Sequence, residues 1–155
     1  PWINGHLEND TISLYDSAQV GMAVALGRDG LIVPVIRDAH AIGLGAVAAE
    51  RVRLAEKARA GTLTPADLSG ATFTVTNIGN YGVEFFNPII PPPQIAILGV
   101  GALKDAVVAR DGVPTVRPQI GLSLSFDHRA VDGAPAAEFL QTLVGILEDP
   151  SVQLV

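Results

Sequence analysis

Gly, Pro or a charged residue interrupts every apolar run of this chain well before the run could cross a membrane. The 155 residues include 16 Gly and 11 Pro, the two residue types that most often end helices and strands. A bilayer-spanning helix needs about 20 predominantly apolar residues, so we expect no membrane span. Short apolar runs between turns are typical of strands in a folded domain.

The composition is apolar for a domain without such a span. Hydrophobic residues make up 48% of the chain and charged residues only 17%, whereas about a quarter of residues are usually charged. Intrinsic disorder requires the opposite balance, and the length suits one domain with a sizeable core. The excess of apolar residues predicts surface that is hidden against further copies of the chain.

Charge and cysteine content exclude several function classes. The net charge is −6 and no basic cluster occurs, so nucleic acid is not an expected partner. The chain has no Cys, which excludes disulfides, thiolate metal sites and an acyl-cysteine intermediate. Its three His lack metal-ligand spacing, so no metal site is expected.

The pattern along the chain predicts strands interleaved with two substantial helices. One helix spans residues 44–60 and ends at Gly61. A single turn follows Thr64, and the second helix opens within 132–135 and runs to about 148. Asp111-Gly112 marks a two-residue hairpin, and Pro34 suits only a sheet edge or bulge. This irregular order predicts an α+β fold with a mixed sheet. The strand-like segments are 12–15, 20–26, 31–36, 71–78, 95–100, 106–110, 113–117 and 120–126, and the second helix is expected to bury Phe139, Leu140, Leu143 and Leu147.

Two glycine-rich segments imitate dinucleotide-binding motifs. Gly43-Leu44-Gly45 follows a polar loop where that motif needs a strand, and the sequence after Gly101 does not continue it. No Gly-x-Ser-x-Gly motif supports a serine hydrolase. His6 and His40 lie in polar surroundings and are interpreted as surface residues.

His128 lies in a different setting, in the short connection between a strand ending at Phe126 and the last helix. Two carboxylates and an arginine lie within a few residues. Local hydrogen bonds can fix one ring nitrogen and leave the other free as a general base. The alternative is a structural turn in which Asp132 caps the helix and His128 only packs.

The segment around His128 resembles the Asp-His-Arg-x-x-Asp-Gly signature of dihydrolipoamide acyltransferases. These proteins form the cores of 2-oxo acid dehydrogenase complexes, and their catalytic domain is similar to chloramphenicol acetyltransferase. The resemblance continues in order over nearly the whole chain. Its further motifs lie at residues 30–39, 61–68, 72–79 and 88–101.

The resemblance implies a two-layer α+β fold, with helices on one face of a mixed sheet, and transfer of an acyl group between dihydrolipoamide and coenzyme A. Coenzyme A is then a substrate, the lipoyl group sits on a separate domain, and no metal takes part. The residues implied are His128 as general base, Thr76 as oxyanion donor and Asp132 as the group that orients the loop, with helix capping as its second role. Gly133 is implied to permit a tight turn, and Asp127 and Arg129 to be structural. Residues 132–137 favour an acetyl or branched-chain acyl group over succinyl.

The resemblance also implies a homotrimer with its site between subunits, and possibly a cage of trimers. Further partners are a lipoyl domain and the decarboxylase and dihydrolipoamide dehydrogenase components, in bacterial cytoplasm or the mitochondrial matrix. Residues 1–155 are expected to correspond to a catalytic domain without the family's N-terminal segment and without lipoyl or subunit-binding domains. The weakly apolar tail at 151–155 favours the trimer over the cage. Two alternatives are a non-catalytic core scaffold and a free-standing CoA-dependent acetyltransferase acting on a small hydroxyl acceptor.

Overall fold

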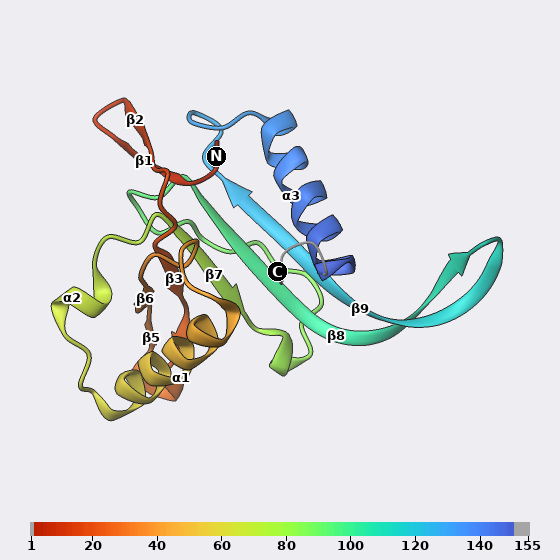
Figure 1. Cartoon of the computed structure of the whole chain (residues 1–155), viewed down its shortest axis with the longest axis horizontal. Helices are drawn as coiled ribbons and strands as arrows, with labels where there is room; N and C mark the ends of the chain where they lie inside the picture. Colours follow the sequence, from red (N-terminus) through yellow and green to blue (C-terminus); the bar gives the residue numbers. More distant parts are fainter. Residues whose placement is uncertain (1, 151–155) are drawn as a thin grey trace.

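The computed structural model describes residues 2–150, so the tail at 151–155 lies outside the described residues. A five-stranded mixed sheet in the order β6-β3-β7-β8-β9 forms its centre (Figure 1). The β3–β7 and β7–β8 pairs are parallel, and the two outer pairs are antiparallel. The mixed sheet predicted from the order of elements is therefore confirmed. Its strands are β3 (Val20–Met22), β6 (Val35–Ile36), β7 (Phe73–Asn77), β8 (Ala96–Arg110) and β9 (Val113–Phe126).

Two small hairpins flank this sheet. The first pairs β1 (Gly5–Glu8) with β2 (Thr11–Leu14), and the second pairs β4 (Val24–Ala25) with β5 (Leu31–Ile32) around the 3-10 turn Gly27–Asp29. Pro34 separates β5 from the edge strand β6, as its missing N–H predicts.

The helices follow local signals in the sequence. Helix α1 (Leu44–Ala60) ends at Gly61, which adopts a left-handed conformation with φ of 66°. The short α2 (Pro65–Leu68) begins at a capping box between Thr64 and Asp67. Helix α3 (Gly133–Glu148) runs beside β9, and α1 lies beside β6 (Figure 1). A second 3-10 turn covers Gly79–Tyr81.

Helix α3 contributes to the core mainly through its first half. Ala136 is buried, and the ring of Phe139 lies 5.7 Å from that of Phe73 in β7. Leu140 and Leu143 are half-buried, whereas Leu147 is 60% exposed, so its predicted burial was wrong. The helical period places Leu147 on the apolar stripe, but no described element of this chain covers that end of the helix.

Strands β8 and β9 form one long hairpin that projects from the body (Figure 1). The sequence predicted four separate strands here. The pairing instead continues through a bulge between Val100 and Leu103, and Asp111 and Gly112 form the tip with positive φ. Along the projecting part, paired residues share a face, and one face is mostly apolar and exposed, with Asp105 as a charged member. Its members include Leu103, Val107, Val116 and Ile120.

The loop after β7 lies against glycines of this hairpin. A Cβ on Gly101 or on Gly121 would collide with the carbonyl oxygen of Glu84, and a Cβ on Gly99 would lie 2.9 Å from the ring of Phe86. These glycines are therefore required by close packing of the loop, and Gly99-Val100-Gly101 is not a nucleotide motif.

Candidate active site

The connection between β9 and α3 presents His128 at the surface. The backbone N–H of Asp127 donates to the carbonyl of Ile95 at 2.8 Å, which ties the connection to the residue just before β8. The carbonyl of Asp127 accepts from the N–H groups of Ala130 and Val131 at 2.9 and 3.0 Å. The turn is thus anchored on both sides of His128.

Of the three predicted site residues, His128 and Asp132 lie together. The Nδ1 atom of His128 is 3.7 Å from the Oδ1 atom of Asp132, and the two side chains are 72% and 84% exposed. The His128 ring also lies 5.7 Å from the ring of Phe126. The Nε2 atom is the ring nitrogen farther from the carboxylate, which suits a base whose other nitrogen is oriented by Asp132.

Two predicted structural roles in this turn were wrong. Asp132 occupies the N-cap position of α3, but its side chain makes no capping hydrogen bond, and its carboxylate lies beside His128 instead. Gly133 is the first residue of α3, and a Cβ there would meet open space. The turn therefore does not depend on the conformational freedom of glycine at this position.

Asp127 and Arg129 form an ion pair beside His128. The Nη2 atom of Arg129 lies 2.7 Å from Oδ2 of Asp127, and its Nε atom lies 3.0 Å from Oδ1. Hydrogen bonds from the Arg129 side chain and backbone lower the pKa of Asp127 from 3.8 to about 2. The carboxylate is therefore ionised wherever a histidine base could act.

Thr76 is separated from this pair within one chain. It lies half-buried in β7, paired with Gly99, which in turn pairs with Ser123 of β9. Two strand spacings and three residues of rise place Thr76 about 14 Å from Phe126, two residues before His128. A single chain does not bring the predicted base and oxyanion donor into one site.

Thr76 does not lie on a solvent-facing polar strand. On the same face of β7, Thr74 is buried and donates a hydrogen bond to Gln94 at 2.7 Å. Paired residues point to the same face, so Thr76 shares that face with Gly99, against which the ring of Phe86 packs.

The two remaining histidines make structural contacts. His6 is half-buried, with Nε2 2.8 Å from the carbonyl oxygen of Ala71 and Nδ1 3.1 Å from the hydroxyl of Tyr15. Its interpretation as a surface residue was therefore wrong. The residues next to His6 along the chain do not reveal these contacts, because the two partners are 65 and nine residues away. His40 is exposed, and its Nδ1 accepts from the N–H of Ala18.

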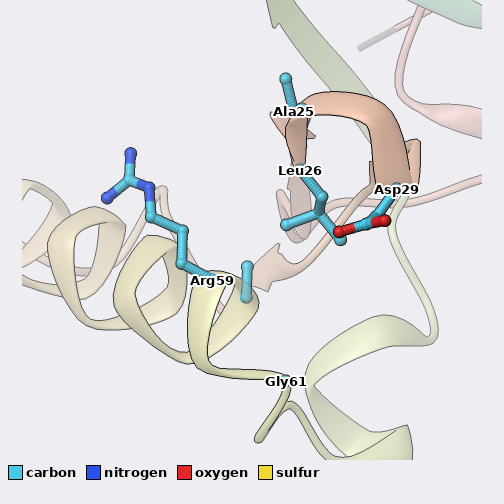
Figure 2. A pocket seen from close by; sticks show the side chains of 7 residues that line it. Ala25, Leu26, Asp29, Arg59 and Gly61 are labelled. Atoms are coloured by element: carbon cyan, nitrogen blue, oxygen red, sulfur yellow. The ribbon is translucent and has the colours of Figure 1, made fainter.

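Two cavities in the described part of the chain lie away from these residues. One of about 450 Å³ lies between the turn of the β4–β5 hairpin and the end of α1, with Leu26 and Asp29 on one side and Arg59 and Gly61 on the other (Figure 2). Another, of about 330 Å³, is lined by His6 and residues 91–94. Neither contains His128, Asp132 or Thr76.

The described part of the chain contains neither a metal cluster nor a membrane-spanning helix. Over residues 2–150, no group of three or more His, Cys, Asp or Glu side chains could hold a metal ion. Within the same residues, no helix is long and apolar enough to span a bilayer.

Comparisons with known proteins agree over the full length of the chain. The family model for the 2-oxoacid dehydrogenases acyltransferase catalytic domain matches residues 1–155. The acetyltransferase component of the acetoin cleaving system of Bacillus subtilis is 45% identical over 100% of this chain. The succinyltransferase component of the 2-oxoglutarate dehydrogenase complex of Haemophilus influenzae is 40% identical over 97% of it. The chain spans 39% and 37% of these relatives.

A solved structure shares the same fold. The dihydrolipoamide acetyltransferase of Azotobacter vinelandii superposes with a TM-score of 0.93 and 39% identity, over 100% of this chain and 64% of that one. Its catalytic mechanism was investigated at a serine, a histidine 52 residues later and an asparagine four residues after the histidine. With the family model and the relatives, this shows that the chain belongs to the 2-oxoacid dehydrogenase acyltransferase family and represents its catalytic domain.

Proposed function

We propose that this chain catalyses acyl transfer between the thiol of dihydrolipoamide and that of coenzyme A, with His128 as the general base. The proposal rests on the spacing of three residues along the chain. Thr76, His128 and Asp132 lie at the same intervals of 52 and four residues as the serine, histidine and asparagine of the Azotobacter enzyme. Thr keeps the hydroxyl of Ser, and Asp keeps the side-chain oxygen acceptor of Asn.

The chemistry follows from the thiol. A thiol with a pKa near 8.5 is mostly protonated at pH 7, so a base must remove its proton as the sulfur attacks the thioester carbonyl. Nε2 of His128 takes that proton, while Asp132 orients the ring through Nδ1. The tetrahedral intermediate then collapses, the second sulfur leaves with the bonding pair, and the imidazolium returns the proton to it. The hydroxyl of Thr76 donates to the oxyanion.

This mechanism requires a second copy of the chain. Thr76 and His128 are too far apart in one chain to contact the same carbonyl, and the side chain of His128 is 72% exposed. We place the site between subunits of a homotrimer, with His128 from one chain and Thr76 from its neighbour. The exposed apolar face of the β8–β9 hairpin supports assembly, because such a face is unfavourable in water. A cage of trimers is a further step of the same proposal.

The substrates and partners are those of a 2-oxo acid dehydrogenase complex. The lipoyl group arrives on a separate domain, and the decarboxylase and dihydrolipoamide dehydrogenase components supply and reoxidise it. Acetyl and succinyl relatives are 45% and 40% identical to this chain. The acetyl or branched-chain preference therefore stays a prediction, as do the chloramphenicol acetyltransferase-like placement of both helices on one face and the cytoplasmic or mitochondrial location.

The test is acyl transfer to dihydrolipoamide by the full-length protein, with acetyl-CoA, a branched-chain acyl-CoA and succinyl-CoA as donors. His128→Ala is expected to lower kcat about 10²–10⁴-fold, the usual contribution of a general base. His40→Ala removes another exposed histidine and is the matched control, with activity unchanged. A wild-type protein that is inactive with every donor, or a His128→Ala variant that keeps more than about a tenth of the activity, contradicts the proposal.

A further inference from the structure

The side chain of Asp127 closes the turn that carries His128. Its Oδ1 atom accepts the backbone N–H of Arg129 at 3.0 Å. A hydrogen bond from an Asp side chain to the N–H two residues later forms an Asx turn, and His128 is the residue enclosed by this turn. The backbone of His128 is therefore held by a side chain that precedes it.

The acceptor in this turn is itself fixed. The N–H of Asp127 donates to Ile95, just before β8, and its carbonyl accepts two backbone N–H groups. Its side chain is only 23% exposed. The Arg129 guanidinium contacts both carboxylate oxygens, at 3.0 and 2.7 Å. The three backbone hydrogen bonds hold Asp127 in place relative to the sheet without the guanidinium.

The ring of His128 has few other restraints within the chain. It is largely exposed, and the 3.7 Å separation between Nδ1 and the Asp132 carboxylate is longer than a hydrogen bond. Its one ring neighbour among the described aromatic contacts is Phe126. The position of the base therefore depends on the backbone of the turn more than on packing of its own side chain.

We infer that Asp127 is a positioning residue for the general base, acting through its hydrogen bond to the N–H of Arg129 and not through its charge. This inference rests on the proposed function, because it concerns the same reaction. A base displaced by about 1 Å can lose up to about 10²-fold in rate, whereas substrate affinity does not depend on this bond. Loss of the turn is therefore expected to lower kcat and leave KM nearly unchanged.

Two conservative variants separate the hydrogen bond from the charge. Asp127→Asn keeps an oxygen at the same distance from the backbone and can form the Asx turn, but it lacks the negative charge. Asp127→Glu keeps the charge and a possible ion pair with Arg129, but its longer side chain does not form that turn. We expect Asp127→Asn to retain kcat within about threefold and Asp127→Glu to lose about 10–10²-fold, both with KM for coenzyme A within about threefold of wild type.

Arg129→Ala completes the set, because it removes the guanidinium and keeps the backbone N–H. It is expected to retain kcat within about threefold. All rates are measured on the full-length protein, at a temperature well below the midpoint of thermal unfolding of each variant. An Asp127→Asn variant as slow as Asp127→Glu, or an Asp127→Glu variant as fast as wild type, overturns the inference.

The same measurements separate this inference from the proposed function. Wild-type activity that disappears in His128→Ala, together with Asp127 variants that do not follow the expected order, removes only the positioning role. A wild-type protein without His128-dependent transfer removes the proposed function and the positioning role with it.

Discussion

At the scale of single residues, the candidate site consists of side chains whose neighbours within one chain are few. His128 and Asp132 are both exposed and lie 3.7 Å apart. A single chain holds the backbone of their turn firmly and leaves their side chains open to water. This openness supports the proposal that a second copy of the chain covers the site.

The hydroxyl of Thr76 provides a test of the proposed oxyanion donor. Thr76→Val keeps the shape of the side chain and removes the donor, and it is expected to lower kcat about 10²–10³-fold. Thr76→Ser keeps the donor and should retain most of the activity. Steady-state kinetics of acyl transfer to dihydrolipoamide checks both variants, and equal activity of the two would remove Thr76 from the mechanism.

Asp67 provides a test of pH dependence. Hydrogen bonds from Lys57, 2.8 Å away, and from Thr64 lower its pKa well below the ordinary value of 3.8. The Asp67 carboxylate therefore takes up a proton less readily in the folded chain than in the unfolded chain. Its contribution to stability is present above about pH 4 and is progressively lost as the pH falls below 3.8. Asp67→Asn is expected to unfold at a lower temperature than wild type at pH 7, with the difference shrinking toward pH 3.

The control for this prediction is Glu56→Gln, which removes an equally negative but exposed carboxylate from α1. Thermal unfolding followed by circular dichroism at pH 7, 5, 4 and 3 gives the comparison. A difference between Asp67→Asn and wild type that stays constant down to pH 3 contradicts the assigned role of the Lys57–Asp67 pair.

At the scale of elements, local signals and long-range packing made different contributions. The boundaries of α1 were predicted to the residue, because Gly43 and Gly61 lie at its two ends. The continuity of β8 and β9 was not predicted, because Gly101 interrupts the apolar pattern. In the folded chain that glycine lies in a bulge against the Glu84 loop and does not end the strand.

Substitutions of Gly101 and Gly145 test whether Gly101 is required by close packing against the Glu84 loop. Gly101→Ala places a methyl group against the Glu84 backbone, so it is expected to displace that loop and destabilise the fold by about 1–3 kcal/mol. Gly145 lies in α3 with open space around it, and Gly145→Ala is expected to stabilise the fold by up to about 1 kcal/mol. Denaturant unfolding measures both, and equal effects of the two substitutions would contradict the close packing at Gly101.

At the scale of the whole molecule, the distance between Thr76 and His128 decides how the site can form. About 14 Å separates Thr76 from the strand end that leads to His128, and neither of the two cavities described above contains these residues. A site built from both residues therefore needs two chains.

Mixed assemblies test this arrangement. His128→Ala and Thr76→Val chains are each expected to be nearly inactive, but an interface with His128 from one variant and Thr76 from the other is intact. Coexpression in equal amounts should restore about a quarter of wild-type activity if subunits mix at random in a cyclic oligomer. A mixture no more active than its components would contradict a site shared between subunits.

The sequence by itself determined the local structure and the residue types of the candidate site. Caps, turns and the period of apolar residues act over a few positions, so α1, α2 and the Asp111-Gly112 turn were predictable. The spacing of Thr76, His128 and Asp132 is likewise a property of the chain. Only the tertiary structure decided that the His6 ring is hydrogen-bonded to the carbonyl of Ala71 and that Thr76 lies far from His128. Those relations depend on which distant strands pair and in what register, and short-range patterns carry no such information.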